Sequence, residues 1–238
     1  AKSEAEEISF IYNQPLWLVN LWIKEMGKDK TVDLCSWFNE QPRLTARINT
    51  VKVSIEDCSK ELEDLDWIVE QDTYIPEVVY IDGHQGHLEK AKPVLEGHIT
   101  FMDKASMLVA HVVDPQPGER ILDCCAAPGG KSMHMASLMN NTGAIMSCDI
   151  YDHKLELINQ NAERLGVSII STKLQDGRYL PDNWKEQFDR VLVDAPCSGL
   201  GILQKKLDMR WRKKESLLIE LPPLQLEILE KASEMVKV

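Results

Sequence analysis

RILDCCAAPGGK, residues 120–131, is the stretch that decides the fold. Its first four residues have the apolar character of a strand, its middle is a loop of small residues, and a helix is predicted from about Lys131 to Met139. A strand that runs into such a loop and then into a helix is typical of an open α/β sheet. In that fold the loop lies where ligands bind, at the carboxyl end of the strand.

The same alternation continues downstream. Apolar strands are predicted at residues 144–149, 169–174 and 189–194. We expect Asp152 to cap a helix that runs to Leu165, with Gly166 as its C-terminal stop. Continuous apolar strands separated by helices indicate a parallel sheet covered on both faces. The predicted fold class is therefore α/β.

An acidic residue ends or closely follows each of these four strands: Asp123, Asp149, Asp176 and Asp194. A single carboxylate in such a place is usually a helix cap, but four beside a glycine loop indicate a ligand-binding edge. Asp149 follows Gly130 at about the spacing of ~20 residues that is typical of an acid holding ribose hydroxyls.

The loop does not have the G-x-G-x-x-G spacing that admits a pyrophosphate, so a nicotinamide enzyme is the weaker interpretation. Small residues let the backbone approach a ligand, and the start of the following helix favours a carboxylate. The pattern favours a ligand with an adenosine at one end and an amino acid at the other.

A cysteine, Cys197, follows the fourth strand in the segment Asp194-Ala195-Pro196-Cys197-Ser198-Gly199. A loop cysteine is more often inert, but a thiol at the ligand edge and near a carboxylate suits covalent chemistry. The six cysteines are scattered, without zinc-type spacing, which indicates free thiols in the cytoplasm. We expect no metal site, and we interpret His84 and His87 as residues of a surface turn.

The first hundred residues mix helices and strands. A helix is predicted to open at Pro15 and to end at Gly27, with a strand over residues 47–53, a helix over 56–65 and a strand over 78–81. A further helix is predicted over residues 101–113. We therefore expect a small α+β module at residues 1–100 and the α/β core at residues 101–238.

The net charge of −11 argues at first against a nucleic-acid partner. Most of the acidic excess lies in the first half of the chain, however, and a basic run occupies residues 205–214. A local basic patch is compatible with binding phosphates. The residues that we expect to contact RNA are Lys205, Lys206, Arg210, Trp211 and Arg212.

The loop LDCCAAPGGK at residues 122–131, together with DAPCSG at residues 194–199, resembles the RNA 5-methylcytosine methyltransferases. The chain is most similar to the bacterial Sun/RsmB-type branch, which acts on small-subunit ribosomal RNA. Shorter similarities at residues 15–18, 47–50, 103–106, 175–178 and 208–211 extend the resemblance over nearly the whole chain.

The resemblance implies a Rossmann-like S-adenosylmethionine-dependent core preceded by an RRM-like, RNA-binding module. It implies that Asp149 holds the ribose, that Asp176 lies by the adenine, and that Asp194 lies near the methyl-transfer centre and also contacts the cytosine. The expected partner is ribosomal RNA, without a membrane or an obligate protein partner. The segment implied to wrap the methionine part consists of Cys125, Ala126, Ala127, Pro128, Gly129, Gly130 and Lys131.

Members of this family use two cysteines. The resemblance gives Cys197 a role in product release, whereas the cysteine that attacks C6 of cytosine follows a further strand. We expect that strand and that nucleophile to lie beyond Val238, after a helix predicted at residues 223–236, so that the core is truncated after its fourth strand. A NusB-like N-terminal domain is also expected to be absent from this sequence.

Two alternatives remain open. In a DNA cytosine-5 methyltransferase, Cys197 would itself be the nucleophile. A binding module would hold the cofactor or RNA without catalysis. The AAPGGK loop and the N-terminal module favour the RNA enzyme, with Cys197 and Asp194 as its catalytic residues.

Overall fold

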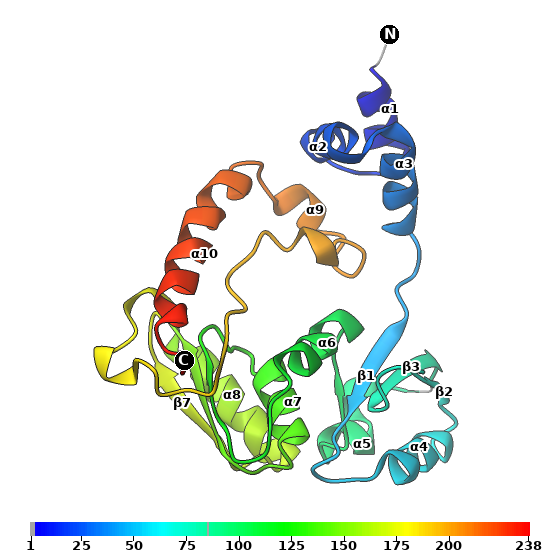
Figure 1. The fold of residues 1–238 in the computed structure, drawn as a ribbon. Helices are drawn as coiled ribbons and strands as arrows, with labels where there is room; N and C mark the ends of the chain where they lie inside the picture. Colours follow the sequence, from blue (N-terminus) through cyan, green and yellow to red (C-terminus); the bar gives the residue numbers. More distant parts are fainter. Residues whose placement is uncertain (1–2, 85) are drawn as a thin grey trace. The chain divides into compact units, whose positions relative to one another are not determined.

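The computed structural model describes residues 3–84 and 86–238, and the chain forms two compact units (Figure 1). The first unit comprises residues 1–42 and 196–225, and the second comprises residues 43–195 and 226–238. The sequence-based division near residue 100 follows the change in element pattern, and it stays a prediction.

The first unit is helical. Helices α1 (Glu4–Ile11), α2 (Leu16–Met26) and α3 (Lys28–Trp37) pack with the turn η4 (Leu200–Ile202) and the short helix α9 (Met209–Arg212). As predicted, α2 begins after Pro15 and ends at Gly27, whose φ is 84°. The buried core of this unit consists of Ala5, Ile8, Leu18, Val19, Trp22, Cys35, Phe38 and Leu203.

The second unit begins with an antiparallel sheet in the order β2-β3-β1-β4. Its strands are β1 (Leu44–Ile48), β2 (Ile68–Gln71), β3 (Val78–Gly83) and β4 (Ile99–Phe101). The short elements between them are α4 (Ile55–Glu63), η1 (Leu88–Lys90) and α5 (Lys92–Leu95). Ala46 and Ile48 of β1 join the apolar cluster formed with α4. Because side chains alternate along a strand, Arg47 points to the opposite face.

The bounds of two predicted elements in this region differ most from the structure. The strand predicted at residues 47–53 ends at Ile48, because Asn49 turns the chain: its Nδ2 donates to the carbonyl oxygens of Gly97 and Leu165, each at 2.8 Å. The helix predicted from residue 101 begins at Lys104 as α6 (Lys104–Val113). Phe101 pairs instead with Ala46, as the last residue of β4.

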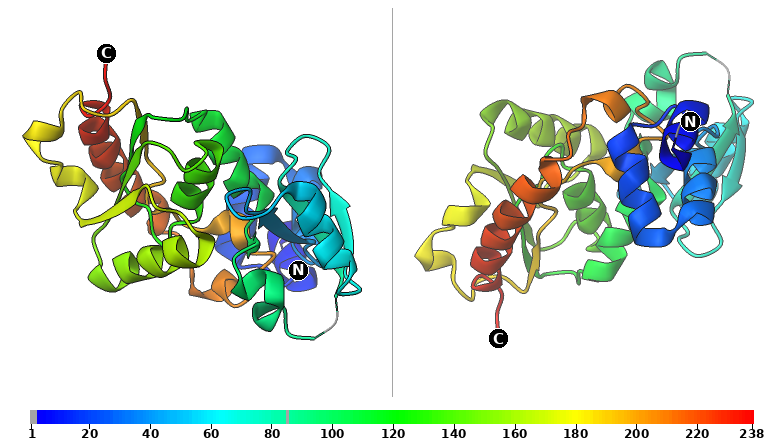
Figure 2. Two further views of the ribbon diagram at one scale, coloured as in Figure 1. Left: turned by 90° about the horizontal axis from the view of Figure 1, so that it is seen from below. Right: turned by 90° about the horizontal axis from the view of Figure 1, so that it is seen from above.

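The second sheet is parallel and has the order β7-β6-β5-β8, which confirms the predicted α/β core. Its strands are β5 (Arg120–Asp123), β6 (Ala144–Asp149), β7 (Ile170–Leu174) and β8 (Arg190–Leu192), with turns η2 (Gly177–Tyr179) and η3 (Asp182–Trp184). Figure 2 shows α6, α7 (Gly130–Leu138) and α8 (Asp152–Leu165) on one side of this sheet. Residues 226–233 of α10 (Leu217–Ser233) lie on the other side.

Details of two helices differ from the prediction. Tyr151 is the N-cap of α8 and makes no side-chain cap bond, so Asp152 is the first helical residue and not the cap. Gly166 ends α8 in the left-handed region, as predicted. Helix α10 begins at Leu217, earlier than predicted, and contains Pro222 and Pro223. Within the described ranges, no helix is both long and apolar enough to span a membrane.

Candidate active site

The four acidic residues lie along one edge of the parallel sheet. Asp123 and Asp149 are the last residues of β5 and β6. Asp176 and Asp194 follow the ends of β7 and β8 by two residues each. Parallel strands end at the same edge, so the structure places these side chains as the sequence predicted.

The small-residue loop crosses the ends of β5 and β6. The amide of Ala126 donates to the carbonyl of Cys148 at 2.8 Å, and the amide of Gly129 donates to that of Ala126 at 2.7 Å. Gly129 is the N-cap of α7 with a φ of 98°, and a Cβ there would lie 3.3 Å from Cε of Met133. Glycine is therefore needed at the point where the loop becomes helix.

Asp123 is buried at the centre of this edge. Ser132 Oγ donates to its Oδ2 at 2.7 Å, and Ser147 Oγ donates in turn to Ser132 Oγ at 2.9 Å. Burial raises the pKa of Asp123 to about 6. Its Oδ1 is buried and makes no well-formed hydrogen bond with any residue that the structure describes. Sequence reasoning missed Ser132; its place in the first turn after the loop was the only signal.

Lys131 and Asp194 form an ion pair, with 2.6 Å between Nζ and Oδ2. Lys131 comes from the first turn of α7 and Asp194 from the segment after β8, so the pair bridges two neighbouring strands of the sheet. Asp149 is fixed differently: the amide of Tyr151 donates to its Oδ1 at 3.1 Å, and Lys154 Nζ lies 3.5 Å from the same oxygen.

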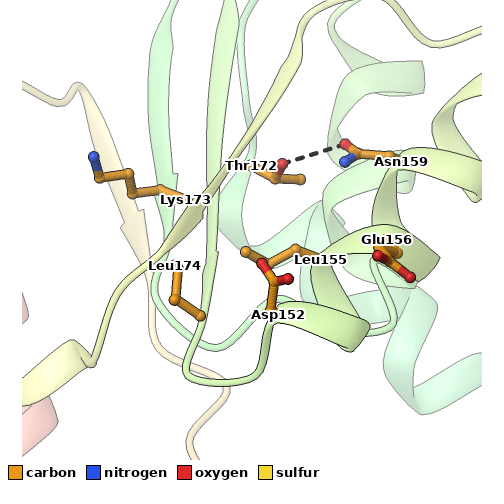
Figure 3. Close-up of a pocket in the computed structure, with 7 residues that line it drawn as sticks. All are labelled: Asp152, Leu155, Glu156, Asn159, Thr172, Lys173 and Leu174. Carbon is orange, nitrogen blue, oxygen red and sulfur yellow. Dashed lines mark hydrogen bonds between the residues drawn. The ribbon is translucent and has the colours of Figure 1, made fainter.

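Asp176 is held by its own turn. The backbone amide of Arg178 donates to its Oδ1 at 2.9 Å, and Nη2 of Arg178 donates to Oδ2 at 2.7 Å. These bonds lower the pKa of Asp176, so that its carboxylate stays charged. Beyond this position, a pocket lies between α8 and the edge strand β7 (Figure 3). It is lined by Asp152, Leu155, Glu156, Asn159, Thr172, Lys173 and Leu174, none of which is a predicted site residue.

Comparison with known proteins identifies the family. The model of the family described as 16S rRNA methyltransferase RsmB/F matches residues 110–238, which is more than half of the chain. The chain belongs to the RsmB/F methyltransferase family. A second model, for the ferredoxin-like domain of RsmF/B-like methyltransferases, matches residues 14–86. Both the predicted family and the predicted fold class are confirmed.

Two curated relatives are similar in sequence to nearly the whole chain. A probable ribosomal RNA small subunit methyltransferase B from Bacillus subtilis is 36% identical over 94% of the chain and 50% of its own length. The protein of the same description from Synechocystis is 35% identical over 95% of the chain and 51% of its own length. The chain thus spans about half the length of these relatives.

Solved structures agree with this fold. The crystal structure of PH0851 is 34% identical, with a TM-score of 0.92 over 99% of this chain and 53% of that one. A methyltransferase homologue from Pyrococcus horikoshii, 24% identical, has a TM-score of 0.86 over 100% of this chain and 74% of that one, and it supports the fold alone. RsmB/F proteins are S-adenosylmethionine-dependent methyltransferases, so the predicted cofactor is confirmed for the family.

Cys197, the family-motif cysteine of this RsmB/F chain, differs from its five other cysteines. Its side chain is exposed, whereas Cys35, Cys58, Cys124 and Cys148 are buried and Cys125 is half-buried. Burial raises the pKa of Cys125 and Cys148 to about 12, which keeps them as inert thiols at neutral pH. Cys197 follows Asp194 by three residues in sequence and belongs to the first unit.

The basic run of this RsmB/F chain lies around α9, and one of its residues departs from the prediction. Trp211 is 60% exposed, and Arg212 is exposed beside Asp208. Arg210 is only 2% exposed. Its Nη2 donates to the carbonyl of Phe38 at 2.5 Å and its Nη1 to Oδ1 of Asn39 at 2.8 Å. The predicted RNA contact of Arg210 is therefore wrong, because its guanidinium group is used inside the helical unit.

Proposed function

We propose that this protein transfers a methyl group from S-adenosylmethionine to C5 of a cytosine in small-subunit ribosomal RNA, in the cytoplasm. The observation that carries the proposal is the ion pair of Lys131 and Asp194 at the acidic edge of an RsmB/F core. The names of the relatives from Bacillus subtilis and Synechocystis supply the ribosomal RNA substrate. The cytosine and its C5 position come from the motif resemblance.

The residues at the edge fit S-adenosylmethionine, which supplies an electrophilic methyl group when bound. The first amides of α7 have no partner within the helix and favour the methionine carboxylate. Asp149 would accept hydrogen bonds from the ribose, and Asp176 would lie by the adenine. The buried Oδ1 of Asp123 is a further acceptor, which matches the amino group of the methionine part.

Cytosine C5 is a poor nucleophile, so the proposed route is covalent. A cysteine thiolate adds to C6, and C5 then gains the electron density to form its bond to the methyl group, whose bond to the sulfonium sulfur would break so that S-adenosylhomocysteine leaves. Loss of the C5 proton restores the double bond and expels the thiolate. In this proposal Lys131 orients the carboxylate of Asp194, which contacts the cytosine.

Cys197 acts in product release in this proposal, and its exposed thiol suits contact with a macromolecule. The attacking cysteine implied by the resemblance follows a further strand, and none of the six cysteines of this chain occupies that position. The base must be unpaired or flipped out to reach the sheet edge. The exposed Trp211, with Lys205, Lys206 and Arg212, is proposed to bind the RNA.

The test is methylation of unmodified 16S ribosomal RNA with methyl-labelled S-adenosylmethionine. The full-length gene product is used beside this chain, because the chain spans about half of its relatives. Digestion to nucleosides and chromatography should place the label in 5-methylcytidine. Label in another nucleoside would exclude the C5 assignment. Methylation of DNA in preference to RNA would favour the DNA enzyme with Cys197 as nucleophile.

A further inference from the structure

A buried polar cluster joins the antiparallel sheet to the methyltransferase core inside the second unit. Oε1 of Glu77, the residue before β3, lies 2.7 Å from Nε2 of His134 on α7 and 2.6 Å from Nε2 of His111 on α6. Glu77 and His134 are buried, and His111 is half-buried. One carboxylate oxygen of the ferredoxin-like module therefore contacts two helices of the methyltransferase core.

The protonation of the cluster follows from its contacts. Burial opposes the charge of Glu77, but hydrogen bonds from His134, from the backbone amide of Glu77 and from His111 outweigh it and lower the pKa of Glu77 to about 2. Burial lowers the pKa of His134, so its ring is neutral. An ionised carboxylate only accepts hydrogen bonds, so both rings donate from Nε2.

Arg47 supplies the positive charge that balances the ionised carboxylate of Glu77. Its side chain is fully buried on the face of β1 opposite the apolar cluster, and its three guanidinium nitrogens have no hydrogen-bond partner among the residues described. Burial lowers the pKa of Arg47 to about 10, and the charge of Glu77 opposes that shift. The guanidinium stays protonated at neutral pH. Glu77 is therefore its counter-charge as well as the acceptor for His134.

The three ligand-type atoms of Glu77, His111 and His134 lie within 4.8 Å of one another, a spacing that a metal ion could also use. Electrostatics argue against this occupant. A divalent cation would stand near the buried positive charge of Arg47, with Glu77 as the single nearby anion of the cluster. The carboxylate of Glu77 is already satisfied without a metal, because it accepts a hydrogen bond from each of the two imidazole rings.

The position of His134 connects this cluster to the candidate active site. His134 lies one turn after Gly130, at which α7 begins, and the first turn carries Lys131 and Ser132. These two residues bind Asp194 and Asp123. Because a helix turn is rigid, a rotation of α7 at His134 would displace both contacts.

We propose that Glu77 is a positioning residue for methyl transfer: from the ferredoxin-like module it fixes His134 and thereby the first turn of α7 at the cofactor loop. This inference rests on the proposed function, since it assigns that turn to cofactor binding. It makes the N-terminal module a structural part of the cofactor site, in addition to any role in binding RNA.

The experiment compares Glu77→Gln with Glu61→Gln. Glu61 is a matched control, because its Oε2 lies 2.6 Å from Nδ1 of His98, in a similar carboxylate–imidazole pair that does not involve α7. S-adenosylhomocysteine binding is measured by calorimetry at a temperature where circular dichroism shows each variant fully folded. Loss of the charged hydrogen bonds should weaken binding about tenfold in Glu77→Gln, and the control should stay within about twofold.

Hydrogen exchange of residues 130–138 gives a second readout that needs no cofactor. Glu77→Gln should speed exchange of the hydrogen-bonded amides from Met133 onward, whose first bond is donated to the carbonyl of Gly129, and Glu61→Gln should not. If wild-type protein fails to bind the cofactor product, the proposed function fails, and exchange still decides the positioning role. Should Glu77→Gln not fold, His134→Gln and His134→Ala replace it: glutamine keeps an N–H donor and should retain more affinity than alanine.

Two results would overturn the proposal. Unchanged affinity and exchange in Glu77→Gln, with only a lower melting temperature, would mean that the cluster merely stabilises the fold. Stoichiometric binding of Zn²⁺ to the wild-type chain, abolished by Glu77→Gln, would mean that the cluster is a metal site.

Discussion

Nζ of Lys131 lies 2.6 Å from Oδ2 of Asp194, which joins the first turn of α7 to the segment that follows β8. The lysine side chain is 19% exposed and that of the aspartate is 50% exposed. The pair therefore lies at the rim of the sheet edge, where the carboxylate is accessible and the ammonium group fixes its direction. This arrangement places two residues of separate sequence motifs in one ion pair, for which we propose a shared role in methyl transfer.

Removal of the lysine tests that role. In the full-length gene product, Lys131→Met should lower kcat for methyl transfer by about 10²-fold, the scale of a lost positioned polar group in a reaction centre, with a smaller change in RNA affinity. Lys185→Met is the control, since Lys185 pairs with Asp182 at 3.3 Å on the surface, away from the sheet edge. Equal rates for Lys131→Met and the control would show that the ion pair has no catalytic role.

Asp149 should determine cofactor affinity. Asp149→Ala removes the predicted acceptor of the ribose hydroxyls and should weaken binding of S-adenosylhomocysteine by about 1–3 kcal/mol in calorimetry. Asp152→Ala, three residues later in the pocket between α8 and β7, serves as the control and should bind normally. Equal affinities of Asp149→Ala and wild type would contradict the ribose assignment.

Asp123 should give the fold a distinct pH dependence. Its pKa is raised to about 6 by burial, from an unfolded value of about 4, so the folded state holds a proton that the unfolded state has released between these values. The group's contribution to stability is therefore present below about pH 4 and is lost as pH rises through about 6. In urea unfolding without cofactor, the stability of wild type relative to Asp123→Asn should fall across this window. A constant difference would contradict the raised pKa.

The basic residues around α9 should determine the salt dependence of RNA binding; Lys205, Lys206 and Arg212 are exposed, and Lys213 is half-buried. Replacement of Lys205, Lys206, Arg212 and Lys213 by Gln should weaken binding and flatten the plot of log affinity against log salt, by about 0.7 per lost phosphate contact on single-stranded RNA. Replacement of Lys24, Lys28 and Lys30 by Gln, in the helical part of the same unit, is the control. An unchanged slope would place the phosphate-binding surface elsewhere.

Cys197 should be needed for release and not for attack. In the full-length gene product, Cys197→Ala should still transfer methyl to RNA but accumulate a covalent RNA–protein adduct through the second cysteine, visible as a shifted band on a denaturing gel. The 238-residue chain should form no adduct with the same RNA. If the variant forms no adduct and the chain alone forms one through Cys197, then Cys197 is the nucleophile and its assigned role is wrong.

The sequence by itself determined the methyltransferase core. Residues 120–131 predicted the strand, loop and helix that the structure contains, and the acid after each strand predicted the ligand edge, because parallel strands end on one side of a sheet. The bounds of β5 and β6 agree with the prediction. These features are local in the chain, so residue pattern and spacing were sufficient to find them.

Only the tertiary structure decided which polar side chains lie at the surface and which are used inside the protein. Arg210 appeared in a basic run, and its burial depends on Phe38 and Asn39, which lie more than 150 residues away in sequence. The hydrogen bond between Glu77 and His134 joins residues 57 positions apart in the sequence. It connects two modules, and the residue pattern of neither module predicts it. Spacing rules describe neighbours along a helix or strand, whereas burial and ion pairing depend on which distant segments the packed core brings into contact.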